Sequence, residues 1–315
     1  MPINTTIKVA ACQMQSKLGD VSYNLKHAEE LIQEGFNQGA QWVVIPEFFT
    51  TGIGFHPSLI GGALPLEGIA LELLTKSAKR YNGYVAGSFI AIQGGGRYNT
   101  FVLAKPDGTY ATHNKDIPTL WENCYFRGGS DDGVIKTDDA TIGAVICWEI
   151  IRWQTARRLK GKIDFVTAVS AWWGMPNYPP FIKKVFNKLE KENLGIVHNS
   201  PGRLARILGV PVVYAAHAGE MHCRDPLFVI PYHTYYAGQT QITDNTGNIL
   251  AIMSEKDGAG VIAVDITLIE AIPQEPLQDA LWIPRLPWEL KLAWRLYNAH
   301  GKRYYQKLKQ RGFQL

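Results

Sequence analysis

The stretch TIGAVICWEIIRW, residues Thr141–Trp153, decides the fold that we expect for this chain. Residues 142–146 form a near-continuous apolar run, which is typical of a strand buried on both faces. Cys147 follows directly, and the polar residues Glu149 and Arg152 come next. A reactive group at the end of a buried strand is characteristic of α/β proteins. Most intracellular cysteines are small buried hydrophobes, however, so Cys147 alone does not indicate a nucleophile.

The order of apolar patterns around this stretch predicts a mixed fold. Apolar runs predict strands at residues 7–13, 42–46, 84–92, 99–104, 165–170, 210–216, 240–244 and 260–265, with a short strand ending at His113 and an NTG turn between the last two. Helical spacing predicts helices at residues 24–35, 69–81, 154–159, 178–191, 202–209 and 285–309. Alternation early and strand pairs later favour an α+β sandwich over a Rossmann-type wrap. The long loop at 114–133 is of a kind that is usually functional.

Composition limits the classes of protein to consider. The chain has 315 residues, 46% hydrophobic and 19% charged, which is ordinary for one large globular domain. A net charge of +4 is too small to indicate a nucleic-acid or membrane partner. The C-terminal stretch is more basic, and we expect a solvated helix face there, formed by Lys302, Arg303, Lys307, Lys309 and Arg311.

Cysteine usage and the absence of targeting patterns predict a cytoplasmic, soluble protein. The four cysteines are far apart and have no CxxC spacing, so we expect neither a disulfide framework nor a zinc site. The two histidines of HAGEMH, residues 217–222, do not match the HExxH pattern, so no metal is predicted. The N-terminus has no signal-peptide pattern, and no apolar run approaches the roughly 18 residues that span a bilayer.

Two further stretches supply charged partners for the cysteine. They are PEFFTTG at 46–52 and HNKDIPTLWENCYF at 113–126, and together they contain two carboxylates and an ammonium. With AVICWEI around the cysteine, they resemble the three motifs of the nitrilase, or carbon–nitrogen hydrolase, superfamily. That resemblance implies a Glu–Lys–Cys triad made of Glu47, Lys115 and Cys147.

The resemblance continues beyond the triad, over about residues 6–270. Glu122 opens an E-x-x-Y-F-x-x-G pattern, AGQTQITDNTG at 237–247 resembles a family hairpin with Thr240 in place of serine, and GVIAVDITL resembles the last core strand. It implies a four-layer α-β-β-α sandwich over residues 1–272. It also implies a C-terminal helical extension, 273–315, that packs on a partner protomer in a homodimer or larger homo-oligomer. Residues 151–159 and 282–304 are the candidate contacts.

These residue types suit the hydrolysis of an amide. A Cys147 thiolate attacks the carbonyl and divides the reaction into two easier steps. Glu47 takes the thiol proton and gives it to the leaving amine. Lys115, with the backbone N–H of Trp148, stabilises the oxyanion. Glu122 is expected to position substrate or the hydrolytic water.

Each assignment has a simpler alternative. Glu47 could be an exposed strand-end residue or an N-cap partner, Lys115 a solvated loop charge, and Glu122 a loop-ordering ion pair. Glu149 has a supporting role or forms an ion pair with Arg152 or Arg157. The substrate-binding candidates are aromatic, although large aromatics are usually core residues: Phe48, Trp121, Tyr125, Trp148, Trp172 and Trp173. Because neighbours on an extended backbone face opposite sides, we expect one of Trp172 and Trp173 to line the site.

The sequence thus predicts an amidase-like enzyme that needs no cofactor and acts on a small molecule. Ile150 departs from the nitrilase signature, which has histidine or asparagine after Cys-Trp-Glu, and PEFFTTG is more typical of amidases. The Cys-Trp-Glu triplet itself favours a nitrilase. A nitrilase, an acyl transferase and an N-carbamoyl amidohydrolase remain alternatives on the same triad. A catalytically silent binding protein is the alternative from a different class.

Overall fold

The computed structural model describes residues 4–176 and 180–311. Its strands are β1 (Thr5–Met14), β2 (Trp42–Val44), β3 (Leu64–Pro65), β4 (Tyr84–Gln93), β5 (Gly96–Ala104), β6 (Tyr110–Asn114), β7 (Val134–Lys136), β8 (Thr141–Ile146), β9 (Phe165–Ser170), β10 (Val212–Arg224), β11 (Pro231–Thr243), β12 (Ile249–Ser254) and β13 (Gly260–Leu268). Its helices are α1 (Val21–Asn37), α2 (Ser58–Gly61), α3 (Ile69–Tyr81), α4 (Trp153–Leu159), α5 (Pro180–Leu208) and α6 (Trp288–Gln310). Short 3-10 turns are η1 (Leu120–Cys124), η2 (Cys147–Ile151) and η3 (Glu255–Asp257).

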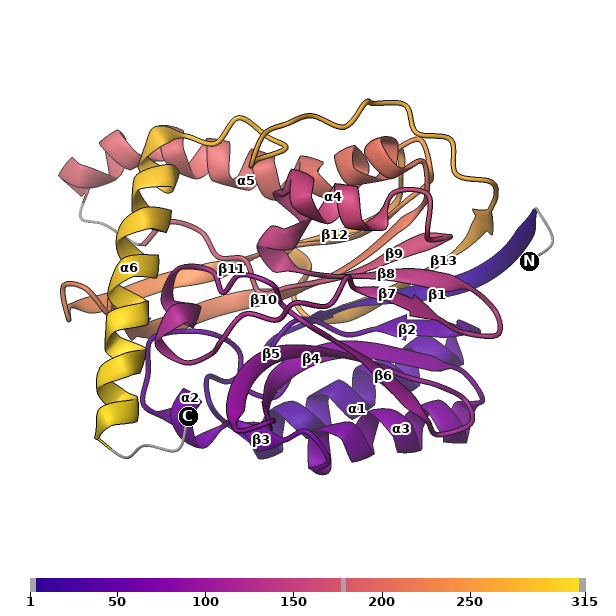
Figure 1. Ribbon diagram of the computed structural model, residues 1–315, viewed down its shortest axis with the longest axis horizontal. Helices are drawn as coiled ribbons and strands as arrows, with labels where there is room; N and C mark the ends of the chain where they lie inside the picture. Colours follow the sequence, from indigo (N-terminus) through magenta and orange to yellow (C-terminus); the bar gives the residue numbers. More distant parts are fainter. Residues whose placement is uncertain (1–3, 177–179, 312–315) are drawn as a thin grey trace.

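The strands form two layers that join at one place. The first layer has the order β6-β5-β4-β2-β1-β13, and the second has the order β7-β8-β9-β10-β11-β12. β1 and β10 join the layers by pairing Gln13 with Ala216 and Met14 with His217. Figure 1 shows α1 and α3 outside the first layer and α4 and α5 outside the second. The predicted α-β-β-α sandwich is therefore confirmed.

Side-chain alternation along β1 explains how the first layer packs on both of its faces. Val9 and Ala11 belong to the core that includes the second layer. Ala10 and Cys12 point to the other face and pack in the core under α1 and α3. There the Cys12 thiol donates to the backbone oxygen of Leu31 in α1, at 3.8 Å. The near-continuous apolar sequence of this strand is thus the result of burial on two sides.

An aromatic contact connects the two layers at the starts of β2 and β9. Trp42 of β2 stacks on Tyr84, with ring centroids 3.7 Å apart, and meets Phe165 of β9 edge-on, with centroids 5.1 Å apart. Glu47 follows β2 and Ala171 follows β9. The contact lies at the first residue of each strand, and the segments that carry Glu47 and Ala171 leave from the opposite ends.

Two helices that the sequence predicts separately form one helix in the structure. We expected helices at 178–191 and 202–209, and the first two residues of the former range lie outside the described residues. The structure has the single helix α5, which contains Pro201. Proline lacks a backbone donor and usually ends a helix. The helix continues because Val197 and Leu204, on either side of the proline, are both buried in the core.

One predicted strand pair is wrong. The NTG turn joins β11 to β12, a strand that the sequence pattern does not predict. Residues 260–265 belong instead to β13, which pairs with β1. β12 lies at the edge of its layer, and Ile249, Leu250 and Ile252 are exposed there. Its burial therefore produces no alternation that a sequence pattern could reveal.

The C-terminal helix α6 packs against η1 of its own chain, across one end of the sandwich (Figure 1). The side-chain oxygen of Asn298 accepts hydrogen bonds from the backbone N–H of Leu120, at 2.9 Å, and from Asn123 Nδ2, at 3.0 Å. Arg127 Nε donates to the hydroxyl of Tyr305 at 2.9 Å. Contact of residues 273–315 with a partner protomer stays a prediction.

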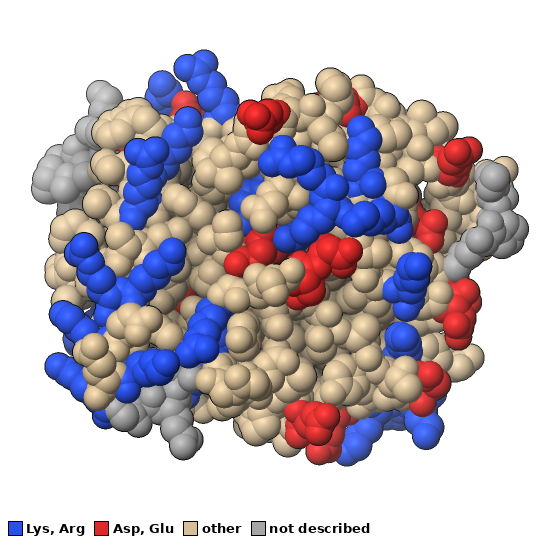
Figure 2. Space-filling model, viewed as in Figure 1, with Lys and Arg blue, Asp and Glu red and all other residues tan. Residues whose placement is uncertain are grey.

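The outward face of the C-terminal segment is basic. The lysines and arginines predicted to form a solvated helix face are all exposed: Lys302, Arg303, Lys307, Lys309 and Arg311. Figure 2 shows blue side chains gathered along this part of the surface. In the part of the chain that the structure describes, no helix is both long enough and apolar enough to cross a membrane.

Candidate active site

Cys147 is the first residue of η2, directly after β8. Its φ angle is +51°, a left-handed conformation that residues other than glycine rarely adopt. Strain of this kind persists only where the surrounding structure holds it, and it is frequent at functional sites. The cysteine is buried, with 4% of its surface exposed. The strand-to-turn transition thus fixes one orientation of the thiol at the carboxyl end of β8.

Glu47 is fully buried after β2 and is oriented by three donors. Its Oε1 accepts hydrogen bonds from Lys115 Nζ, at 3.0 Å, and from Asn99 Nδ2, at 2.7 Å. Its Oε2 accepts one from the backbone N–H of Ala171, at 2.7 Å. The donors come from β5 and from the segments after β6 and β9. An exposed strand-end glutamate would have none of these partners, so that alternative is wrong.

The Lys115 ammonium lies between two carboxylates. Lys115 is 1% exposed, and its Nζ is 3.0 Å from Glu47 Oε1 and 2.6 Å from Glu122 Oε1. The other oxygen of Glu122 accepts the backbone N–H of Thr119, at 3.0 Å. The loop that carries Glu122 is therefore tied to the ammonium as well as to its own turn, and Lys115 is not a solvated loop charge.

Mutual electrostatics set the protonation of this cluster. Burial lowers the pKa of Lys115, but Glu122 and Glu47 raise it more, so the pKa lies above its ordinary value and the ammonium stays charged. Burial raises the pKa of Glu122 to about 7, while Lys115 opposes this effect and Glu47 adds to it. Glu122 therefore changes charge near neutral pH.

The Cys147 thiol is held in its protonated form. Burial, followed by the charge of Glu47, raises its pKa, and Lys115 acts in the opposite direction. Ser170 Oγ, at the end of β9, donates to Cys147 Sγ at 3.6 Å and also lowers the thiol pKa. Because the thiolate is the nucleophilic form, attack by this cysteine requires a base within reach.

The six aromatic candidates divide between two clusters. One cluster contains four of them: Phe48, Trp121, Tyr125 and Trp173. In it Trp121 stacks on Trp173, with centroids 4.9 Å apart. Trp148 and Trp172 pack in the other, with centroids 5.2 Å apart. Trp172 and Trp173 thus face different clusters, as extended backbone requires, and which of them lines the site stays a prediction.

Glu149 has other partners than those predicted. We expected an ion pair with Arg152 or Arg157 if the residue were structural. Glu149 instead pairs with Arg158, at 3.1 Å, and with His113, at 3.0 Å. Arg157 donates to the backbone oxygen of Gln278, at 2.7 Å. The helical turn after η2 therefore directs Arg158, and not its neighbour, toward the candidate site.

Three groups that contact Glu47 or Cys147 were not predicted from the sequence. They are the side chains of Asn99 and Ser170 and the backbone N–H of Ala171. A weak signal was present, because Asn99 opens an apolar strand and Ser170 ends another, both at positions where a purely structural strand needs no polar group. Ala171 gives no signal, because any residue except proline provides that N–H.

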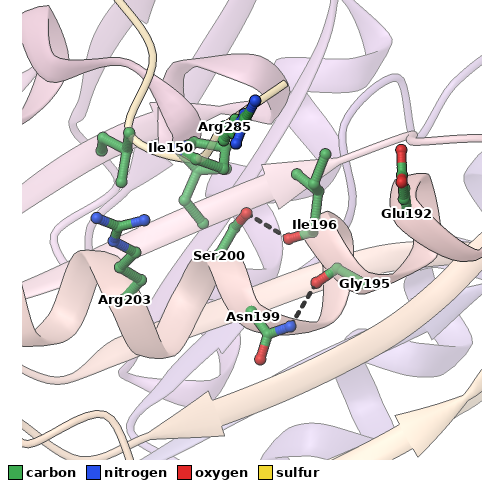
Figure 3. A pocket seen from close by; sticks show the side chains of 10 residues that line it. Ile150, Glu192, Gly195, Ile196, Asn199, Ser200, Arg203 and Arg285 are labelled. Carbon is green, nitrogen blue, oxygen red and sulfur yellow. Dashed lines mark hydrogen bonds between the residues drawn. The ribbon is translucent and has the colours of Figure 1, made fainter. Parts of the chain in front are cut away.

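A cavity of about 360 Å³ lies next to the nucleophile turn but belongs to another region. Figure 3 shows it between α5 and the segment that contains Arg285, with Ile150 as the contribution of η2. Its walls include Ile196 and Arg203 of α5. None of the four clustered residues Glu47, Lys115, Glu122 and Cys147 lines it, so this cavity is not the candidate active site.

Comparison with known proteins identifies the family. The model of the carbon-nitrogen hydrolase family matches residues 8–181, which include Glu47, Lys115, Glu122 and Cys147. The chain is 31% identical to a nitrilase of Pyrococcus abyssi over 183 residues, 55% of this chain and 68% of that protein. It is 32% identical to the omega-amidase NIT2 of Danio rerio over 140 residues, 40% of this chain and 50% of that protein. The chain spans about half the length of several other curated relatives.

The fold comparison agrees. A mutant of the amidase from Nesterenkonia sp. AN1 superposes with a TM-score of 0.65 at 19% identity, over 91% of this chain and 99% of that one. The layered α-β-β-α fold and the family match over more than half of the chain together define the class of protein. The chain belongs to the carbon–nitrogen hydrolase family.

We predict that Ser170→Ala slows alkylation of Cys147 by iodoacetamide at pH 7. The hydroxyl donates to the sulfur, and loss of one hydrogen bond, worth about 0.5–1.5 kcal/mol, corresponds to a rate about 2- to 10-fold lower. The pH profile of the rate should shift upward, because the bond lowers the thiol pKa. Peptide mass spectrometry follows the label on Cys147.

Ser88→Ala is the matched control for this prediction. Ser88 is also fully buried in a strand, and its hydroxyl has no hydrogen-bond partner among the described residues. Its removal should leave the rate unchanged. Equal rates for Ser170→Ala and the unmodified protein would show that the Ser170 hydroxyl does not act on the thiol.

Proposed function

We propose that this chain is a thiol hydrolase that cleaves the nonpeptide C–N bond of a small amide through a thioester on Cys147. The observation that carries the proposal is the buried Lys115 ammonium between Glu47 and Glu122, within electrostatic reach of the thiol. A charge-paired lysine beside a cysteine and a carboxylate provides a nucleophile, a base and an oxyanion partner in one place. Amidases among the relatives support the substrate class.

In the first half-reaction Glu47 accepts the proton of the Cys147 thiol, and the sulfur attacks the amide carbonyl carbon. The carbonyl oxygen becomes negative, and Lys115 Nζ and the N–H of Trp148 stabilise it. The C–N bond then breaks while Glu47 returns the proton to the nitrogen. Ammonia or an amine leaves, and the acyl group remains as a thioester.

In the second half-reaction water attacks the thioester. Glu47 takes a proton from the water, the C–S bond breaks, and the proton returns to the sulfur as the acid leaves. Glu122 positions the substrate and the water, and its bond to Lys115 keeps its carboxylate beside the reacting groups. Its pKa of about 7 makes the charge of this holding group sensitive to pH near neutrality.

A nitrile is the second candidate substrate, because the relatives include nitrilases. Attack of the same thiol on a C≡N bond gives a thioimidate, which needs one additional water to reach the thioester and ammonia. Both substrates end as acid and ammonia, so the products alone do not separate them. Consumption of an added amide does.

We also propose that the protein is cytoplasmic and at least dimeric, with domain limits at 1–272 and 273–315. Four free, buried cysteines favour a reducing compartment. α6 packs on its own chain with one face and exposes Trp288, Leu292 and Leu296 on another. Because these residues recur every four positions, they form one apolar stripe on the helix, suited to a second copy.

The test of activity is ammonia release from a panel of amides, carbamoyl amines and nitriles. We expect turnover of at least one amide, and we expect Cys147→Ala to remove it with little change in fold. Cys12→Ala is the matched control, because Cys12 is equally buried but packs against α1, and it should retain activity. More than a trace of turnover by Cys147→Ala would exclude the thioester route.

Substitution of the two glutamates should impair different steps of the reaction. Glu47→Gln removes the base but keeps the shape, so acylation should fall by about 10²- to 10⁴-fold. Glu122→Gln keeps the base and should allow acylation with slow release. Intact-protein mass spectrometry during turnover should therefore find an adduct on Cys147 in Glu122→Gln and not in Glu47→Gln. Identical behaviour of the two variants would contradict this division of roles.

Sedimentation at micromolar concentration tests the assembly. We expect at least twice the chain mass of 35.2 kDa. Leu292→Glu should shift the protein toward the monomer, because it places a charge in the apolar stripe. Leu250→Glu is the control, since Leu250 is 44% exposed and Leu292 is 45% exposed. A monomer in the unmodified protein would refute the proposal.

A further inference from the structure

A second buried charged cluster lies beside the candidate active site, and Glu149 is at its centre. Glu149 is fully buried, and its carboxylate accepts four hydrogen bonds. Oε2 accepts the backbone N–H of Ile146, at 2.8 Å, and His113 Nε2, at 3.0 Å. Oε1 accepts the backbone N–H of Asp116, at 3.0 Å, and an N–H of Arg158, at 3.1 Å. All four lone-pair positions of this carboxylate are thus used.

Two of these donors are the backbone neighbours of proposed catalytic residues. Asp116 directly follows Lys115, and Ile146 directly precedes Cys147. One carboxylate therefore connects the segment after β6, in the first layer, with the end of β8, in the second layer. We propose that Glu149 is a positioning residue that holds the Lys115 ammonium and the Cys147 thiol at their working separation. This inference rests on the proposed function of those two residues.

The backbone conformation of Cys147 requires such support. Its φ of +51° is unfavourable for a residue with a Cβ, and the Glu149 carboxylate bonds to the residue just before it. On the other side of the strained residue, Arg152 Nε donates to the backbone oxygen of Trp148, at 3.2 Å. The turn that carries the nucleophile is thus bonded on both sides of Cys147.

The surrounding charges keep Glu149 ionised. Burial raises the pKa of Glu149, but His113 and Arg158 lower it more, so the pKa lies well below its ordinary value. Burial lowers the pKa of His113, whereas Glu149 and Asp131 raise it to about 9. His113 is hydrogen-bonded to Asp131 through its other ring nitrogen. The histidine is therefore a buried cation between two carboxylates at neutral pH.

Asp116 and two arginines complete the cluster. Asp116 Oδ1 is 2.5 Å from an N–H nitrogen of Arg152, and Asp116 Oδ2 is 2.7 Å from one of Arg158. Arg158 thus bridges Asp116 and Glu149. A buried charged network contributes little net stability compared with apolar residues of the same shape, whereas breaking it at one member is costly. Apolar residues could not accept the backbone N–H groups of Asp116 and Ile146. Placing these two segments is therefore a role that needs the carboxylate.

Glu149→Gln is the experiment that tests this role. An amide cannot accept all four donors, so the Ile146 and Asp116 contacts cannot both persist in their present form. We expect kcat to fall by about 100-fold with a much smaller change in KM, since misplacement by about 1 Å costs that much. We also expect the iodoacetamide rate profile of Cys147 to shift to higher pH, because Lys115 no longer lowers the thiol pKa as effectively.

The direction of the pH shift separates a positioning role from a purely electrostatic or a purely stabilising one. Removal of a nearby negative charge alone would favour the thiolate and shift the profile to lower pH. A residue that only stabilises the fold would leave the profile of the folded protein in place. Asp244→Asn is the matched control, because Asp244 also accepts backbone N–H groups, those of Thr246 and Asn248, in the turn between β11 and β12. It should change neither kcat nor the profile.

A second variant keeps the inference testable if Glu149→Gln does not fold. Glu149→Asp keeps the negative charge but shortens the side chain by one carbon, so it cannot reach the backbone N–H groups of both Ile146 and Asp116. It should shift the profile to higher pH, whereas an electrostatic role alone would leave the profile in place. The proposal would be overturned if, in either folded variant, kcat were retained and the pH profile of alkylation were unchanged or shifted to lower pH. If the unmodified protein hydrolyses no amide of the panel, the proposed function fails, while the alkylation profiles still decide the positioning role.

Discussion

Burial of the Lys115 ammonium is the constraint on which the rest of the site depends. An unpaired charge in a protein interior costs several kcal/mol, so this lysine obliges the fold to bring carboxylates to it. Glu47 arrives from the end of β2 and Glu122 from the loop after β6. Two carboxylates exceed the charge of one ammonium, and the raised pKa of Glu122 relieves that surplus.

The same constraint explains why the two strand layers are coupled. The donors to Glu47 come from β5 in the first layer and from the end of β9 in the second. Glu149 also connects the layers, because it accepts the backbone N–H groups of Asp116, after β6, and Ile146, at the end of β8. β1 and β10 pair over a short length only, and the layers are also joined by a shared hydrophobic core that includes the Trp42–Phe165 contact. The hydrophobic core and the polar contacts of the candidate site thus both connect the two layers.

The sequence predicted the layered fold, since buried runs such as residues 142–146 and the helical spacing of 69–81 carry strong local patterns. The resemblance to the family also predicted that Glu47, Lys115, Glu122 and Cys147 form one site. The order of these residues along the chain does not by itself show that they are close in space. The sequence could not predict β12, whose exposed edge position leaves no periodicity, or the continuity of α5 through Pro201, which depends on tertiary burial. The contact of Ala171 with Glu47 could not be predicted either, because it is made by a backbone N–H.

The packing of α6 has an optical consequence. Trp148, the residue after Cys147, stacks on Trp294 of α6 with ring centroids 5.4 Å apart and 6° between the planes, and Trp282 meets both rings edge-on. Trp172 lies 5.2 Å from Trp148. Indole transitions at such separations couple strongly, so this group contributes to the circular dichroism in the ultraviolet, together with the Trp121–Trp173 pair. The protein thus has an internal, label-free reporter of whether its C-terminal helix is docked beside the nucleophile turn.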